Sequence, residues 1–266
     1  MNKLFIACLS ICLMVKGILI AHSSLVIEER HELFTLAVLT YLYVHSENHP
    51  KPGHDIAALI AWDVENVEKT PEFVIDCNRN FEKQGGIFHA EMMTIEKALH
   101  KTQTTDNKEP EDNPKEHFDR VKKRLSNTTL YASLEPCPFC TMGISWVRIP
   151  KVIYFMDDPG MRDCETYTPI ISFPQEFFIG RQLTSLISSK LPLATEINQD
   201  LKEIVLQDIV NKYVILLPNG KKLIDLDRYL VEKGVFKSAH DQFFSFQIKY
   251  SQNNQLFRDL QNFLRR

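Results

Sequence analysis

The feature that most constrains this fold is a pair of short motifs far apart in the sequence, which can bind one metal ion only if folding brings them together. They are His89-Ala90-Glu91 and Pro136-Cys137-Pro138-Phe139-Cys140. One imidazole and two thiolates are ligands that Zn²⁺ prefers, and three protein ligands with an open fourth position are typical of catalytic zinc sites. The chain must therefore place the two motifs at one point.

Each motif stands at the predicted start of a helix, which suits the chemistry of its side chains. Cys137 and Cys140 are three residues apart, so both sulfurs fall on one helix face, where the helix dipole favours thiolates. Glu91 lies two positions beyond His89 and should point differently from that ligand. We expect Glu91 to move protons, from water to a ring nitrogen and then to a departing amine.

A structural zinc site or a redox pair is the alternative interpretation, because a Cys-x-x-Cys sequence alone is also found in both. A structural zinc ion needs a fourth protein ligand, for which His100 and Cys164 are the available residues. Neither belongs to a second ligand-like pair. The sequence therefore favours one catalytic Zn²⁺ per chain, held by His89, Cys137 and Cys140.

The hydrophobic pattern around these motifs alternates between helix and strand. Three segments have apolar residues at helical spacing: 28–44, 89–99 and 136–147. Four short apolar runs are typical of strands: 56–62, 73–77, 128–134 and 151–155. The first two strands are expected to form a hairpin. This order predicts an α/β domain over residues 24–165, in which helices cover a mixed central sheet.

The N-terminal segment, residues 1–23, is typical of an export signal. An apolar stretch runs from Leu4 to Ile20, and Ala21-His22-Ser23 suits cleavage before Ser24. The expected product is a secreted or periplasmic protein that needs no membrane partner. A retained anchor, with the protein on a membrane, and a buried N-terminal helix in an intracellular protein are the alternatives. Lys16 argues against a spanning helix, because a charge at mid-membrane is costly.

Two further segments lie outside the predicted core. Residues 101–120 are charged and contain Pro110 and Pro114, so they are expected to form an exposed insertion. Residues 166–266 are expected to form a C-terminal α+β extension, with a strand, turn and strand over 212–226 and an amphipathic last helix. The extension could pack on the core or close over the pocket.

Cysteine content and charge limit the other interpretations. After signal cleavage the chain keeps Cys77, Cys137, Cys140 and Cys164, too few for a disulfide-built scaffold. A disulfide between Cys77 and Cys164 and two separate thiols both remain open. The formal net charge of −3 gives no overall basic surplus for a phosphate backbone. The densest basic run, 122–124, is typical of a solvated helix face.

At its motifs the chain resembles the cytidine and deoxycytidylate deaminase superfamily, most closely the branch of tRNA adenosine deaminases and guanine deaminases. The layout His-x-Glu followed by Pro-Cys-x-x-Cys is the established signature of zinc-dependent deaminases. The blocks that carry the resemblance occur in family order: 77–80, 89–92, 134–140 and 145–154. The resemblance covers about half the chain, near residues 28–165. It implies a three-layer α/β/α fold around a five-stranded mixed sheet, one zinc ion and often a homodimer.

The resemblance also implies roles for individual residues. Asn78 matches a position whose amide contacts the base, although an asparagine there is also a common turn residue. The backbone amides of Ala90 and Cys137 are implied near the zinc. The implied activity is hydrolysis of a C–N bond in a cyclic amidine, releasing ammonia. The implied substrate is an amino-bearing purine: adenosine in a nucleoside or in tRNA, or guanine.

Departures from the family pattern keep other functions open. Phe88 precedes the first motif, where the family usually has a proline nearby, and residues 156–160 are acidic where tRNA-acting enzymes are commonly basic. Together with the expected export, this makes a small purine or nucleoside as well supported as RNA. The alternatives are a cytosine-type nucleoside or nucleotide deaminase and a catalytically silent, exported binding module on the same fold.

Overall fold

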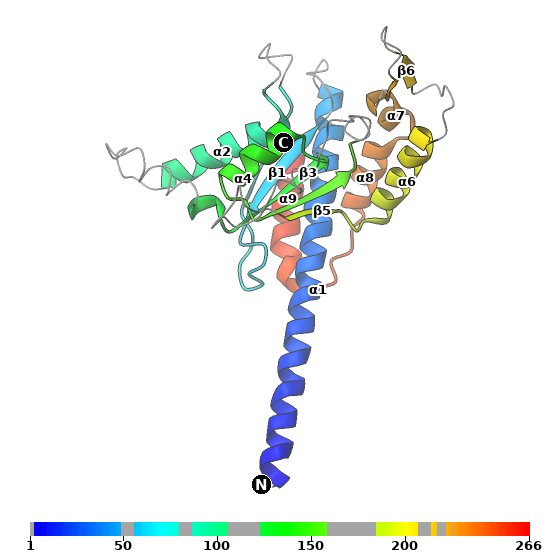
Figure 1. Cartoon of the computed structure of the whole chain (residues 1–266). Coiled ribbons are helices and arrows are strands. Elements are labelled where there is room, and N and C mark those ends of the chain that lie inside the picture. The colour runs from blue at the N-terminus through cyan, green and yellow to red at the C-terminus, as the bar shows by residue number, and fades with distance from the viewer. Residues whose placement is uncertain are drawn as a thin grey trace, which may run out of the picture.

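A five-stranded mixed sheet forms the centre of the protein, and helices cover both of its faces (Figure 1). The computed structural model describes residues 3–48, 56–79, 87–105, 123–158, 185–206, 214–216, 222–224 and 226–266. The strands of the central sheet are β1 (Ala57–Trp62), β2 (Phe73–Cys77), β3 (Thr128–Leu134), β4 (Lys151–Met156) and β5 (Ser185–Ser188). The principal helices are α1 (Lys3–Asn48), α2 (Ala90–Thr105), α4 (Pro138–Trp146), α6 (Pro192–Leu206), α7 (Leu226–Glu232), α8 (Val235–Phe244) and α9 (Asn254–Leu264).

The strand order is β2-β1-β3-β4-β5. β1 pairs antiparallel with β2 and with β3, whereas β3, β4 and β5 run parallel to one another. Parallel neighbours need a crossover, and α4 supplies it between β3 and β4. The expected α/β class, the mixed sheet and the hairpin of the first two strands are confirmed. The fifth strand comes from beyond residue 165, within the segment that the sequence assigned to the extension.

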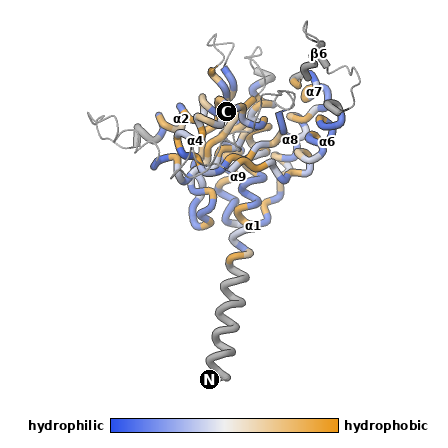
Figure 2. The backbone as a smooth tube through the Cα atoms, in the orientation of Figure 1, coloured by the Kyte–Doolittle hydropathy of each residue, from blue (hydrophilic) through white to orange (hydrophobic). Residues whose placement is uncertain are grey.

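Side chains of β1 alternate between two hydrophobic cores, as the pleat of a strand requires. Leu59 belongs to the core shared with α1 and the C-terminal helices. Its neighbour Ile60 belongs to the core shared with α2 and α4. Both residues are fully buried. Figure 2 shows apolar residues gathered in the centre of the molecule. The continuous apolar sequence of β1 thus reflects burial on both faces.

Helix α1 is much longer than the segment 28–44 that periodicity predicts, and it passes unbroken through the expected cleavage site before Ser24. Its N-terminal half extends away from the other elements (Figure 1). His22 contacts the ring of Tyr250, with the ring centroids 5.4 Å apart. In the part of the chain that the structure describes, no helix has the length and hydropathy needed to span a bilayer. Cleavage before Ser24 stays a prediction.

The C-terminal elements pack against α1, on the face of the sheet opposite α2 and α4. Their buried residues join the core that α1 builds with the sheet, for example Ala194, Phe243 and Leu256. The expected strand, turn and strand are present as β6 (Val214–Leu216) and β7 (Lys222–Ile224), which pair antiparallel. The expected last helix is α9. Of the two placements considered for this segment, its described helices support packing on the core.

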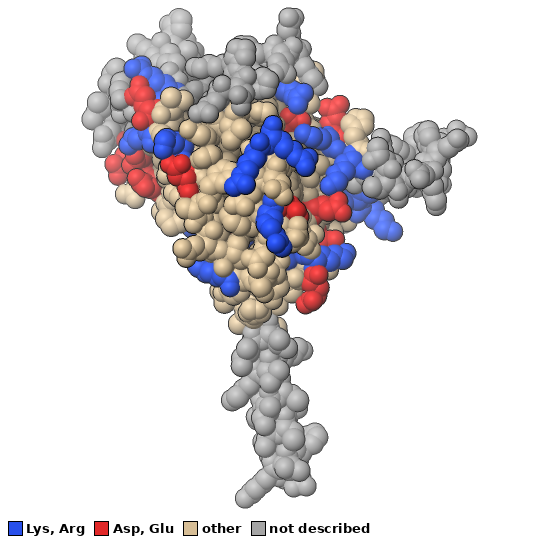
Figure 3. All heavy atoms as spheres, turned by 180° about the vertical axis from the view of Figure 1, so that it is seen from behind, with Lys and Arg blue, Asp and Glu red and all other residues tan. Residues whose placement is uncertain are grey.

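The exposed insertion expected at residues 101–120 begins later than predicted. α2 continues to Thr105, because no Gly or Pro interrupts the sequence after Leu99 before Pro110. Residues 106–122 lie outside the described residues, and these include the first residue of the basic run 122–124. On the face in Figure 3, Lys and Arg side chains gather near the middle, while acidic side chains lie mainly toward the flanks.

A buried arginine ties α1 to two distant parts of the chain. The guanidinium of Arg30 donates to the carbonyl oxygens of Val64 (2.9 Å), Asn66 (2.8 Å) and Lys69 (2.8 Å) in the loop between β1 and β2. Its Nε donates to Oδ1 of Asn253, just before α9, at 2.8 Å. Burial lowers the pKa of Arg30. These acceptors take the place of water around the buried cation.

Asn253 continues the network from the C-terminal side. Its Nδ2 donates to the carboxylate of Glu29 (2.8 Å) and to the carbonyl of Val26 (3.0 Å), both on α1. The carboxylate of Glu29 also accepts the backbone N–H of Lys249 at 2.7 Å. The segment before α9 is therefore joined to α1 through buried hydrogen bonds.

We expect Arg30→Met to lower the free energy of unfolding by about 3–5 kcal/mol, because it leaves the buried Oδ1 of Asn253 and the carbonyl of Val64 without this donor. Urea unfolding followed by circular dichroism measures this. Arg258→Met is the matched control, since Arg258 is exposed on α9 and its substitution should change stability by less than about 0.5 kcal/mol. Equal stability of the two variants would contradict the role given to Arg30.

Candidate functional site

The start of α2 carries the first motif. His89 precedes the helix, and its carbonyl accepts the backbone N–H of Met93 at 2.9 Å, which makes it the residue that begins the helical hydrogen bonding. Ala90 is the first helical residue and is fully buried. Its amide belongs to the first turn, where N–H groups have no partner within the helix. Glu91 follows in the same turn and is 4% exposed.

Two side chains of α2 fix this helix on the sheet. The hydroxyl of Thr94 donates to the carbonyl oxygens of Ala58 on β1 (3.0 Å) and Ala90 (2.7 Å). Lys97 donates through Nζ to the carbonyl of Ile75 on β2 at 2.8 Å. These bonds hold the start of α2 at a defined place above the first two strands.

The second motif forms the start of α4, directly after β3. Cys137 is the N-cap residue, and its Sγ accepts the backbone N–H of Cys140 at 3.5 Å. Pro138 takes the first helical position, where its fixed φ suits the helix and its missing N–H costs no hydrogen bond. Thr141 donates its hydroxyl to the carbonyls of Pro136 and Cys137, which fastens the turn. The expected helix start is confirmed.

Folding brings His89, Cys137 and Cys140 together as the sequence predicted, with their ligand atoms all within 4.8 Å of one another. Nδ1 of His89 lies 3.4 Å from Sγ of Cys137 and 3.3 Å from Sγ of Cys140. A tetrahedral zinc ion with ordinary bond lengths separates nitrogen from sulfur by about 3.6 Å. The donor set therefore fits one Zn²⁺ after small outward movements.

The two thiols differ in acidity because they share a hydrogen bond. The bond from the Cys140 thiol, followed by the contact with His89, lowers the pKa of Cys137. The same bond, together with burial and the neighbouring Glu91, raises the pKa of Cys140. The fold alone thus favours one thiolate, and a bound cation would remove the remaining proton.

Glu91 lies beside the ligand set, next to the thiol of Cys140. Oε2 of Glu91 is 3.3 Å from Sγ of Cys140. Burial raises the pKa of Glu91, so this carboxyl retains a proton to higher pH than an exposed one. A carboxyl group that both takes up and releases a proton is what a proton-transfer role requires.

Asn78 follows β2 and is 3% exposed. Its backbone N–H continues the hairpin by donating to the carbonyl of Ile56 at 2.9 Å. Its side-chain Oδ1 is buried and accepts no hydrogen bond from any described residue. A buried acceptor without a donor is costly, which makes Oδ1 suited to receive a donor from a ligand.

Sequence reasoning missed a buried carboxylate beside Asn78. Asp76 on β2 accepts from Nη2 of Arg79 and from the backbone N–H of Cys77, both at 2.9 Å, and lies 3.7 Å from Nζ of Lys97. The ion pair between Asp76 and Arg79 therefore connects residues on either side of Asn78 in the sequence. The available signal was an aspartate within the otherwise apolar strand 73–77.

The aromatic residue between the two cysteines also belongs to the site. The ring of Phe139 meets the imidazole of His89 edge to face, at 6.0 Å between centroids. Phe139 is about half exposed. Within the described residues Cys77, Cys137 and Cys140 are thiols, and Cys164 lies outside them. The pairing of Cys77 with Cys164 stays unassigned.

Comparison with known proteins covers the segment that holds both motifs. Residues 31–156 match a family model described as the cytidine and deoxycytidylate deaminase zinc-binding region. A tRNA-specific adenosine deaminase of Bacillus subtilis (strain 168) is 32% identical over 77 residues, which are 29% of this chain and 37% of that protein. The match thus spans well under half the length of this relative.

Solved structures similar to this chain include two kinds of deaminase. A structure from work on A-to-I editing by tRNA:A34 deaminases at the wobble position of transfer RNA is 20% identical, covering 60% of this chain and 98% of that one, with a TM-score of 0.38. A guanine deaminase from Nitrosomonas europaea is 14% identical, covering 67% of this chain and 84% of that one, with a TM-score of 0.39.

We expect the purified chain to bind one zinc ion and Cys137→Ser to weaken that binding by more than about 100-fold, beyond what loss of an outer-shell partner costs. Zinc content after dialysis against a chelator measures this. Cys77→Ser is the matched control, because Cys77 lies outside the ligand set, and it should retain the metal. Loss of zinc from both variants alike would count against the assigned ligands.

Proposed function

Because residues 31–156 match the cytidine and deoxycytidylate deaminase zinc-binding region, we propose that this chain is a zinc-dependent hydrolase that removes the amino group of a purine. The proposed substrates are guanine and adenosine, the latter as a nucleoside or within tRNA. The observation that carries the proposal is the burial of Glu91 beside Cys140, one of the three residues expected to bind the metal. A metal site alone would not require a proton carrier at that position.

The residues would share the reaction as follows. His89, Cys137 and Cys140 would hold Zn²⁺, which when bound acts as a Lewis acid and lowers the pKa of a water molecule toward neutrality. Glu91 takes a proton from that water and delivers it to a nitrogen of the ring. It then carries the second proton to the departing amino group. Water and the amine are thereby converted into a carbonyl product and ammonia, and Glu91 returns to its starting state.

Asn78 supports a nucleobase as the substrate. Its buried Oδ1 can accept an N–H from the base, and its Nδ2 can donate to a ring acceptor, so the amide can recognise one edge of a purine. The relative from Bacillus subtilis is a tRNA-specific adenosine deaminase, and adenosine contains a purine. A small base or nucleoside and an RNA substrate are both compatible with this recognition.

Two other functions make different predictions. A cytosine-type deaminase would release ammonia from cytidine or deoxycytidylate and leave purines unchanged. A catalytically silent binding module would bind such compounds without releasing ammonia. The retained Glu91 favours an enzyme over this module, since binding alone has no use for a proton carrier. Export to a secreted or periplasmic location stays a proposal that rests on the N-terminal sequence.

We expect Glu91→Gln to retain zinc and to lower the rate of ammonia release by roughly 10²- to 10⁴-fold, the usual contribution of a positioned acid or base. The assay uses zinc-loaded protein with guanine, adenosine, cytidine, deoxycytidylate and tRNA in parallel. Glu96→Gln is the matched control, because Glu96 is exposed on the same helix. Activity that survives in Glu91→Gln would refute the proposed proton transfer.

We expect Asn78→Leu to raise KM for the purine by about tenfold or more, because it removes hydrogen bonds to the base. Its free energy of unfolding should fall by less than about 1 kcal/mol, because the buried, unsatisfied Oδ1 is removed as well. Steady-state kinetics and urea unfolding measure the two effects. An unchanged KM would show that Asn78 has only a structural role in the turn.

A further inference from the structure

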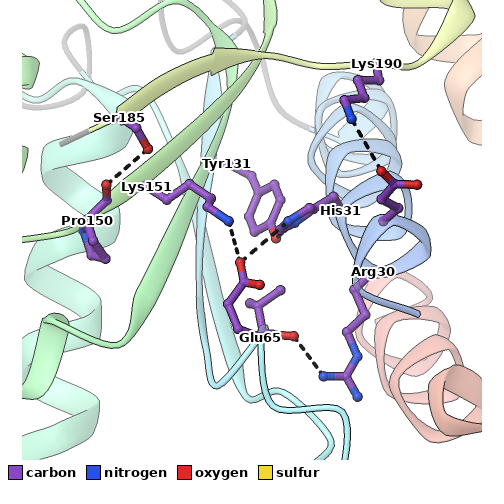
Figure 4. A network of polar contacts seen from close by, with 10 residues as sticks. Arg30, His31, Glu65, Tyr131, Pro150, Lys151, Ser185 and Lys190 are labelled. Carbon is purple, nitrogen blue, oxygen red and sulfur yellow. Dashed lines mark hydrogen bonds and ion pairs between the residues drawn. The ribbon is translucent and has the colours of Figure 1, made fainter. Parts of the chain in front are cut away.

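A cavity lies away from the metal ligands, between α1, the start of β4 and the segment after β5. Its volume is about 580 Å³, and its polar walls carry His31, Glu65, Lys151 and Lys190. Figure 4 shows His31, Lys151 and Glu65 converging there. Ile27 of α1 adds an apolar surface. The proposed deaminase function uses none of these residues.

The cavity is separate from the metal site because the two lie at opposite ends of the parallel strands. Lys151 is the first residue of β4, whereas the other end of β4, at Met156, accepts the backbone N–H of Glu135, two residues before Cys137. At about 3.3 Å per residue, the length of β4 places the two ends roughly 17 Å apart. A ligand in the cavity would therefore not touch the metal ligands.

His31 presents a fixed hydrogen-bond donor to the cavity. Its Nδ1 lies 2.6 Å from the hydroxyl of Tyr131, a residue with no solvent exposure. Burial raises the pKa of Tyr131, so its hydroxyl stays protonated and is placed to donate to Nδ1 of His31. The neutral ring then carries its own proton on Nε2, which faces Glu65 at 3.8 Å.

The position of Glu65 shows what kind of group the cavity receives. Its carboxylate forms an ion pair with Nζ of Lys151 and lies within charge-interaction distance of Nε2 of His31. Glu65 is 51% exposed, whereas Lys151 is 29% and His31 19% exposed. The side chains of Lys151 and His31 are thus more buried than that of Glu65. The Glu65 carboxylate can therefore move outward into solvent while the two donors stay in place. Exposed ion pairs are weak, so its displacement should reduce ligand affinity by less than about fivefold.

A second ion pair closes the other side of the cavity. Nζ of Lys190 lies 3.4 Å from the carboxylate of Glu28, and both side chains are at least half exposed. Lys190 can therefore turn toward a ligand while Glu28 remains in solvent. The cavity thus has three hydrogen-bond donors: Lys151, Lys190 and the Nε2–H of His31. The carboxylate of Glu65 occupies the space near two of them, Lys151 and His31.

We propose that this cavity binds a small organic oxyanion, a carboxylate or phosphate group on a short apolar body, in the place now taken by the Glu65 carboxylate. The anionic group would contact Lys151 and the Nε2–H of His31. Its apolar part would lie against Ile27. The ligand is thus distinct from the purine proposed for the metal site, and its binding does not depend on deamination.

The test titrates the full-length, zinc-loaded protein with hexanoate and, separately, with inorganic phosphate, while NMR follows the labelled histidine rings. We expect saturable binding that shifts the His31 signals. Burial and then Lys151 lower the pKa of His31 to about 4, Lys190 lowers it further, and Glu65 and Glu28 raise it. Because the anionic group of the ligand takes the place of the Glu65 carboxylate, one anion replaces another beside the ring. Binding is therefore measured from the His31 chemical shifts and not from a change in its pKa. Tighter hexanoate identifies a carboxylate ligand, and tighter phosphate identifies a phosphate ester.

Two pairs of variants separate this site from general charge effects. Lys151→Met should weaken binding by about tenfold or more, whereas Lys237→Met, at an exposed ion pair elsewhere, should leave it unchanged. Glu65→Gln should tighten binding by roughly three- to fivefold, because the internal competitor is gone. Glu68→Gln removes the same charge from the same loop and should have no such effect. Absence of saturable binding, or equal effects within either pair, would overturn the proposal.

Discussion

The guanidinium of Arg30 is the contact on which the arrangement of the α1 face depends. It binds the carbonyl groups of the β1–β2 loop on one side and Asn253 on the other, while Asn253 returns to α1 through Glu29. A charge placed inside a protein needs such partners, and here they come from two distant parts of the chain. The network thus fixes the relative positions of α1, the first hairpin and the C-terminal helices. Burial of apolar surface is not directional, so alone it would define these positions less precisely.

The central sheet divides the molecule into two faces with different roles. On one face α2 and α4 bring the two metal-binding motifs together, since each motif begins a helix at the same end of the sheet. On the other face α1 and the C-terminal helices form a large apolar core. The C-terminal part can therefore add stability without contacting the metal ligands. Glu91 lies in the first turn of α2 and is buried beside Cys140, where it would serve as the proposed proton carrier.

The metal site and most of the strands could be predicted because their signals are local, as in the single helical turn that holds Cys137 and Cys140. Arg30 could not be predicted in the same way. In the sequence it follows two glutamates and looks like part of a solvated helix face, and its partners come from distant segments. β5 was missed for a related reason, because Ser185 pairs with Lys151, far earlier in the chain. Pattern within so short a segment does not distinguish a strand from a loop.

The length of α1 was also missed, because an export signal needs no structural continuity with the helix that follows. That continuity has a consequence for the order of events in the cell. Peptidases act on chain that is locally unfolded, and residues 21–24 belong to a helix that is anchored just beyond them by Val26 and Arg30 in the interior. Once α1 has docked, the bond before Ser24 is held in regular helix beside Tyr250. Any cleavage at that bond must therefore occur before α1 docks. The docking rate of α1 would then decide whether the cleaved or the uncleaved form of the protein accumulates.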